Sequence, residues 1–136
     1  NPKNLFVGGF IGSPKMNFIK SKILSKNINN TEVDIMGSGK INVPKTSDAS
    51  KEGDFVQVGI RPEHLFVNKD SDSNWESKVL VVEKLGSGTF LYLEKDGELL
   101  VAQTDGDSKI KVGEIVKIGF DASRCHIFDE SNQAFK

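Results

Sequence analysis

The sequence feature that most constrains the fold is an internal repeat. The segment KEGDFVQVGI, residues 51–60, matches KVGEIVKIGF, residues 111–120, in a lysine, two glycines, an acidic residue and a valine. Both copies then reach a histidine, an aliphatic residue and a phenylalanine, at 64–66 and at 126–128, with two extra residues in the second copy. Since each copy alone is too short for an adequate core, the repeat indicates two similar modules that pack together.

Short strands joined by turns are expected throughout most of the chain. Apolar and polar residues alternate over 56–60, and two alternating runs flank the glycines of MGSGKI at 36–41. Asp96-Gly97 separates two more such runs. Alternation with a period of two around glycine turns is typical of β-hairpins. We therefore expect an all-β chain of small β-barrel or sandwich lobes.

We divide the chain into three parts on these patterns. The Asn-Pro start and the apolar stripe behind it predict a short helix over residues 1–13. The repeat predicts a first β-lobe over 14–70 and a second over 71–136, joined by a polar stretch. Lobes of this kind leave edge strands that a second chain could cover, which favours an interaction module.

Composition excludes several classes of function. The net charge is −1, so no overall field attracts nucleic acid or anionic lipid. Few aromatic residues are available for stacking bases, which argues against an oligonucleotide-binding barrel. The single cysteine, Cys125, excludes an internal disulfide. No apolar run approaches the ~18 residues of a membrane span.

The motif Gly-Ser-Gly-Lys within 36–41 resembles the end of a phosphate-binding loop, but its surroundings do not fit. The glycine that should come five positions before Gly39 is Asp34, and Ile41 stands where Ser or Thr would hold magnesium. The sequence after it favours a strand rather than a helix. We therefore interpret the motif as a β-turn.

Two further patterns resemble functional sites, but their chemistry does not fit. Asp70, Asp72 and Asn74 match the opening of a calcium loop, but its later glycine and glutamate are missing. Cys125 and His126 could pair as nucleophile and base, yet neighbours on a strand point to opposite faces. Matching His126 with His64 in the repeat favours structural roles for both, and no metal-ligand spacing joins them to Cys125.

One carboxylate departs from simple packing. Glu83 shares a predicted strand face with Val79, Val81 and Leu85, so it could be partly buried. Arg61, fixed by the following proline, is its candidate partner. A solvated glutamate on an edge strand is the alternative.

Four motifs, in this order, resemble one protein family: NLFVGGFIGSPKMNFI at 4–19, GIRPEHL at 59–65, VVEKLGSGT at 81–89 and RCHIFD at 124–129. They are similar to the C-terminal regulatory region of the ATP-binding subunits of sugar-importing ABC transporters, the maltose and multiple-sugar type. The resemblance brackets almost the whole chain. It implies a transport-associated domain of duplicated OB-like lobes behind a nucleotide-binding domain, with 1–13 as the hinge.

The resemblance also implies a function. Two such subunits would sit on the cytoplasmic face of a membrane permease, and their regulatory domains would hold the ATPase pair together during transport. A regulatory protein is a further possible partner. This chain would be non-catalytic and without a cofactor, since its sequence has no nucleotide-binding motif; ATP and magnesium would bind upstream.

We expect the interface with a second subunit to include the turn after the first repeat copy, the corresponding region at 124–128 after the second copy, and the carboxylate of Glu83. The candidate residues are Gly59, Arg61, Pro62, Glu63, His64, Glu83, Arg124, His126 and Phe128. The runner-up is a free-standing β-module that binds a small oxyanion such as molybdate. An enzyme is disfavoured because no residues fill the roles of nucleophile, base and orienting group.

Overall fold

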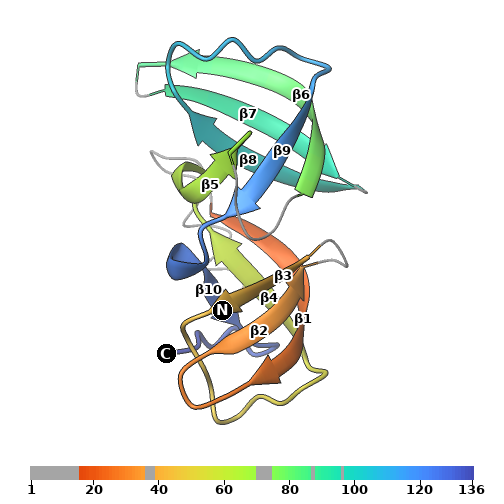
Figure 1. Cartoon of the computed structure of the whole chain (residues 1–136), viewed down its shortest axis with the longest axis vertical. Coiled ribbons are helices and arrows are strands. Elements are labelled where there is room, and N and C mark those ends of the chain that lie inside the picture. The colour runs from red at the N-terminus through yellow and green to blue at the C-terminus, as the bar shows by residue number, and fades with distance from the viewer. Residues whose placement is uncertain (1–15, 36–38, 70–74, 87, 96) are drawn as a thin grey trace.

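The structure, a computed structural model, describes residues 16–35, 39–69, 75–86, 88–95 and 97–136, and every structural statement below refers to these residues. They form two lobes, each built on a five-stranded antiparallel sheet (Figure 1). The all-β prediction is therefore confirmed. The expected helix over 1–13, the tip of the MGSGKI turn and the calcium-like stretch before Trp75 lie outside the described residues.

The two halves of the chain follow the same course of four strands, a 3₁₀ turn and a short fifth strand. The first half contains β1 (Asn17–Lys26), β2 (Thr31–Ile35), β3 (Lys40–Val43), β4 (Phe55–Ile60), η1 (Pro62–His64) and β5 (Leu65–Val67). The second half contains β6 (Trp75–Leu85), β7 (Gly88–Lys95), β8 (Glu98–Thr104), β9 (Ile115–Phe120), η2 (Ala122–Arg124) and β10 (His126–Phe128). The hairpins predicted around MGSGKI and Asp96-Gly97 are confirmed as β2–β3 and β7–β8.

The last short strand of each half joins the sheet of the other half. The first lobe has the strand order β10-β4-β1-β2-β3, and the second lobe has the order β5-β9-β6-β7-β8. Figure 1 shows β5, β10 and the two 3₁₀ turns at the waist between the lobes. This exchange ties the lobes together and places segments far apart in sequence side by side.

The repeat is visible in individual hydrogen bonds. The amide of Lys51 donates to the Asp54 carboxylate (3.0 Å), and the amide of Lys111 donates to the Glu114 carboxylate (3.0 Å). The glycine inside each turn has a positive φ, 90° in the first copy and 93° in the second. The matching lysine, glycine and acid therefore build the same capped turn before β4 and before β9, because only glycine adopts this φ without strain.

The two histidines are not equivalent, and that part of the sequence interpretation was wrong. Phe66 pairs with Gly119 in one sheet, and His126 pairs with Gly59 in the other. The copies therefore align without the two extra residues, and the counterpart of His126 is Phe66 rather than His64. The similar motifs at 64–66 and 126–128 misled the alignment.

The buried side chains of both sheets form one apolar cluster. Trp75, at the start of β6, is only 1% exposed, and its ring stacks on Phe120 with centroids 5.6 Å apart. The alternation of apolar residues along the strands supplies most of the other members, as expected for sheets with one face inside. Packing in one cluster couples the stability of the two lobes.

A single amide side chain also links the lobes. The Asn17 Nδ2 donates to the Ile60 carbonyl (3.2 Å) and to the Val101 carbonyl (2.9 Å). The Val101 amide donates to Asn17 Oδ1 at 2.8 Å. Asn17 lies on β1 and Val101 on β8, the edge strand of the second lobe. Asn17 therefore satisfies both backbone groups of one residue on that edge, as a neighbouring strand would.

Candidate functional site

The turn after β4 contains four of the predicted interface residues. Arg61 precedes η1 in an extended conformation, and Pro62 occupies the first helical position, where its missing N–H is no loss. The His64 amide donates to the Arg61 carbonyl at 3.0 Å. Pro62 is buried, His64 half-buried, and Arg61 and Glu63 exposed. The buried proline therefore anchors a turn that presents charged side chains to solvent.

Strand β10 brings the second predicted segment to the same end of β4. His126 lies opposite Gly59, and the Phe128 ring packs edge-on against Phe18 with centroids 5.7 Å apart. A Cβ atom on Gly59 would lie 2.7 Å from Met16 Sδ and 2.9 Å from Phe128 Cε2. A side chain at 59 would therefore force Met16 and Phe128 to shift, which favours glycine at this position.

The charged and imidazole side chains of the two segments are exposed or half-buried, and we call them the η1–β10 surface: Arg61, Glu63, His64, Arg124 and His126. Lys45 adjoins it, since its Nζ donates to the Cys125 carbonyl at 2.7 Å. Burial lowers the pKa of His126 below its usual value, and the charges of Lys45, Arg61 and His64 lower it further. The surface is therefore locally positive even with His126 neutral.

This shift predicts how stability depends on pH. In the unfolded chain His126 titrates near its ordinary pKa of 6.5, whereas in the folded chain it resists protonation. Well above this pKa, His126 is neutral in both states and contributes nothing to the pH dependence of stability. As pH falls below it, the unfolded state binds a proton that the folded state does not, so stability is lost. His126→Phe, which copies the counterpart residue Phe66, should lose less stability than the parent chain between about pH 7.5 and about pH 5.5 in urea titrations. Equal losses would contradict the assignment.

Glu83 does not join the η1–β10 surface, and the predicted buried pair with Arg61 is wrong. Glu83 is exposed on β6 in the second lobe, and its Oε1 accepts a hydrogen bond from the Tyr92 hydroxyl (3.1 Å). The register of β6 shifts between Val79 and Val81. A β-bulge there turns the rest of the strand, so Val81 is 50% exposed and no longer shares a buried face with Val79.

Glu83→Ala should change the free energy of unfolding by less than about 0.5 kcal/mol, since exposed positions away from caps and cores tolerate substitution. Urea denaturation followed by circular dichroism measures this. A loss above about 1 kcal/mol would indicate that the carboxylate makes a buried ion pair after all.

The Cys125 thiol lacks the properties of a nucleophile. The residue is fully buried, and burial, followed by the charge of Asp121, raises the pKa of the thiol to about 12. A thiol with so high a pKa supplies almost no thiolate near neutral pH. Within the described residues, no group of three or more His, Cys, Asp or Glu side chains could hold a metal ion, and no helix is long and apolar enough to span a membrane.

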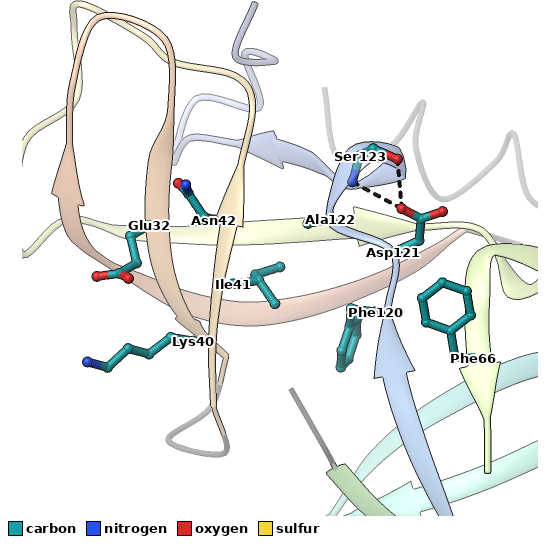
Figure 2. Close-up of a pocket in the computed structure, with 9 residues that line it drawn as sticks. All are labelled: Glu32, Lys40, Ile41, Asn42, Phe66, Phe120, Asp121, Ala122 and Ser123. Carbon is teal, nitrogen blue, oxygen red and sulfur yellow. Dashed lines mark hydrogen bonds between the residues drawn. The ribbon is translucent and has the colours of Figure 1, made fainter. Parts of the chain in front are cut away.

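A cavity that sequence reasoning missed lies between the lobes (Figure 2). Its volume is about 420 Å³. The lining residues come from β2, β3, β5, β9 and η2: Glu32, Lys40, Ile41, Asn42, Phe66, Phe120, Asp121, Ala122 and Ser123. No sequence signal joins these segments, because only the strand exchange brings them together.

Comparison with protein families gives two overlapping matches. Residues 12–65 match the MalK OB fold domain, and residues 58–128 match the TOBE domain. The two matches overlap over residues 58–65, which contain the end of β4 and all of η1. Strand β5 begins there and joins the sheet of the second lobe.

Curated relatives cover nearly the whole chain. It is 37% identical over 135 residues to the maltose/maltodextrin import ATP-binding protein MalK of Aliivibrio fischeri, covering 98% of this chain and 37% of the relative. It is 34% identical over 137 residues to the alpha-glucoside transport ATP-binding protein AglK of Rhizobium meliloti, covering 99% of this chain and 38% of the relative. The chain thus spans little more than a third of the length of these relatives.

A solved structure shares the fold. The cytoplasmic molybdate-binding protein ModG superposes with a TM-score of 0.68 at 17% identity, covering 82% of this chain and 94% of that protein. At this identity the likeness supports the duplicated OB-like architecture alone.

Proposed function

We propose a function on the basis of the family to which this chain belongs. The chain is a member of the TOBE domain family, and its N-terminal part matches the MalK OB fold domain. The chain is the regulatory domain of the ATP-binding subunit of a bacterial sugar-importing ABC transporter. The observation that carries this proposal is the alignment of almost every residue with transport ATP-binding proteins of about three times its length.

Mechanically, the domain holds two ATP-binding subunits together while their nucleotide domains separate. Strand exchange, one shared core and the Asn17 hydrogen bonds join the two lobes. A contact made by one lobe can therefore hold the whole domain. The η1–β10 surface supports a role in that contact, because it presents Arg61 and Glu63 on a turn anchored by the buried Pro62 and exposes Arg124 on η2.

The remaining parts of the proposal concern the whole protein. The subunit lies on the cytoplasmic face of the membrane and binds a permease through its nucleotide-binding domain. ATP and magnesium bind in that domain, and the regulatory chain itself is neither an enzyme nor a cofactor-binding unit. A second copy of the subunit is the main partner of this chain, and a regulatory protein is a further candidate.

Charge reversal on the η1–β10 surface tests the contact. In the full-length subunit, Arg61→Glu combined with Arg124→Glu should weaken dimerisation without nucleotide by at least about tenfold, because reversing two charges on the contact surface removes its electrostatic complementarity. Lys78→Glu combined with Lys109→Glu, two exposed lysines of the second half, is the matched control. A double variant that dimerises like the parent would place the contact elsewhere on the domain.

The alternative is a free-standing module that binds a small oxyanion such as molybdate. It rests on likeness of fold to one molybdate-binding protein. Asp121 on the wall of the interlobe cavity disfavours an anion there, since like charges repel. Calorimetric titration of this chain with sodium molybdate separates the two functions: saturable heat would favour the alternative, and its absence would remove it.

A further inference from the structure

The cavity between the lobes has one polar wall, formed by the free edge of β3. The Ile35 amide donates to the Gly39 carbonyl at 2.9 Å, which fixes the hydrogen-bonded pairs of this hairpin. Because such pairs alternate along antiparallel strands, the backbone N–H and C=O groups of Lys40 and Asn42 point away from β2. β3 is the last strand of its sheet, so these groups form an edge bordering the cavity.

The opposite wall contains two aromatic side chains beside η2. Phe66, on β5, is half-buried, whereas Phe120, at the end of β9, is only 4% exposed and stacks on Trp75. Asp121 stands next to the rings (Figure 2), and its Oδ1 accepts hydrogen bonds from the Ser123 amide (3.2 Å) and hydroxyl (2.7 Å). The Ser123 bonds hold the carboxylate in place and leave Oδ2 to accept from a ligand.

Charged groups sit at the rim of the cavity. The charged ends of Glu32 and Lys40 point away from the two phenyl rings (Figure 2). Asp121 is therefore the ionised group nearest the rings. Asn42 shares the face of β3 with Lys40, so its side chain also points away from the rings (Figure 2). A ligand in this cavity meets the backbone donors and acceptors of β3, one carboxylate oxygen and an aromatic surface.

We infer that the interlobe cavity binds a neutral sugar of one or two rings. A sugar ring has hydroxyl groups that both donate and accept hydrogen bonds, which suits the backbone edge of β3 and Asp121. It also has a face of C–H groups, which suits the electron-rich face of an aromatic ring. A cavity of about 420 Å³ lies in the range of small-molecule sites. The Asp121 carboxylate disfavours the phosphorylated forms.

The regulatory meaning of this site rests on the proposed function. A sugar bound between the lobes bridges the β2–β3 hairpin of the first lobe and η2 of the second. The imported sugar, once inside the cell, would then stiffen the regulatory domain and report its concentration to the ATPase pair. Binding itself requires only this chain.

Amide chemical shifts of the ¹⁵N-labelled chain test the inference. Titration with maltose or glucose should shift the amides of Lys40, Asn42 and Ser123, and leave those of Gly53 and Gly113, outside the cavity, unchanged. Glucose 6-phosphate should bind at least about tenfold more weakly than glucose. Ala122→Trp, at a half-buried position on the cavity wall, places a ring in the cavity and should weaken sugar binding by about tenfold or more. Glu76→Trp, exposed on β6, is the matched control and should bind like the parent.

Three results would overturn the inference: no shift at about 100 mM of either neutral sugar, shifts outside the cavity residues, or equal binding by the phosphate ester. Loss of binding in the Glu76→Trp control would do the same. Failure here leaves the dimerisation role untouched, because that role is measured on the full-length subunit. If this chain binds sugar but the full-length subunit does not dimerise without nucleotide, the sugar site stands and the proposed dimerisation function is rejected.

Discussion

Replacing Trp75 by alanine is expected to lower the free energy of unfolding by about 4 kcal/mol, because removing a buried aromatic ring leaves a cavity as well as losing its burial. Trp75 is only 1% exposed and stacks on Phe120, which also lines the interlobe cavity. Urea denaturation followed by circular dichroism is the suitable measurement, since the variant lacks the single tryptophan of the chain.

Trp75→Phe is the matched control for this prediction. It keeps a ring against Phe120 and removes the indole N–H, which is buried and has no hydrogen-bond partner within the described part of the chain. Because an unpaired buried donor is itself costly, the loss should be no more than about 2 kcal/mol. An alanine variant within about 1 kcal/mol of the parent would contradict the view that this ring is central to the core.

Asn17→Ala is expected to lower the free energy of unfolding by about 2–3 kcal/mol. The substitution removes the three hydrogen bonds that join β1 to Ile60 and Val101, and it leaves the Val101 amide and carbonyl without those partners. Urea denaturation of the whole chain measures the effect.

Asn42→Ala is the control for Asn17→Ala. Asn42 is exposed at the edge of the first lobe, so the change should stay within about 0.5 kcal/mol. If Asn17→Ala is equally mild, the side-chain bridge between the lobes does not contribute to stability.

Local patterns predicted most of the strands. Asp-Gly and the glycines of MGSGKI lie between alternating runs, and the structure confirms both hairpins. The matching lysine, glycine and acidic residues correctly indicated a repeat, and the structure shows why they recur: each copy builds a turn with a positive φ and a side-chain cap, which leaves a clear residue signature.

The failures came from long-range or irregular geometry. The bulge between Val79 and Val81 leaves no residue signature, so extending the alternation put Glu83 on the wrong face. Strands β5 and β10 have three residues each, too few for a pattern that would indicate which sheet they join. Their exchange determines that His126 lies opposite Gly59 and that the interlobe cavity exists.

Part of the candidate site could be predicted from the sequence. Pro62 fixes a turn wherever it occurs, and the GIRPEHL motif drew attention to Arg61 and His64. The proximity of that turn to His126 could not be read from the sequence, because it depends on the pairing of β10 with β4. The cavity was missed for the same reason, since its walls come from both lobes.

Sedimentation of the full-length subunit without nucleotide, with and without this domain, tests the central claim most directly. The domain is proposed to hold two subunits together while their nucleotide domains are apart. The full-length subunit should therefore sediment as a dimer without ATP, and the subunit truncated before this chain should sediment as a monomer under the same conditions. Identical association states for the two proteins would contradict the claim.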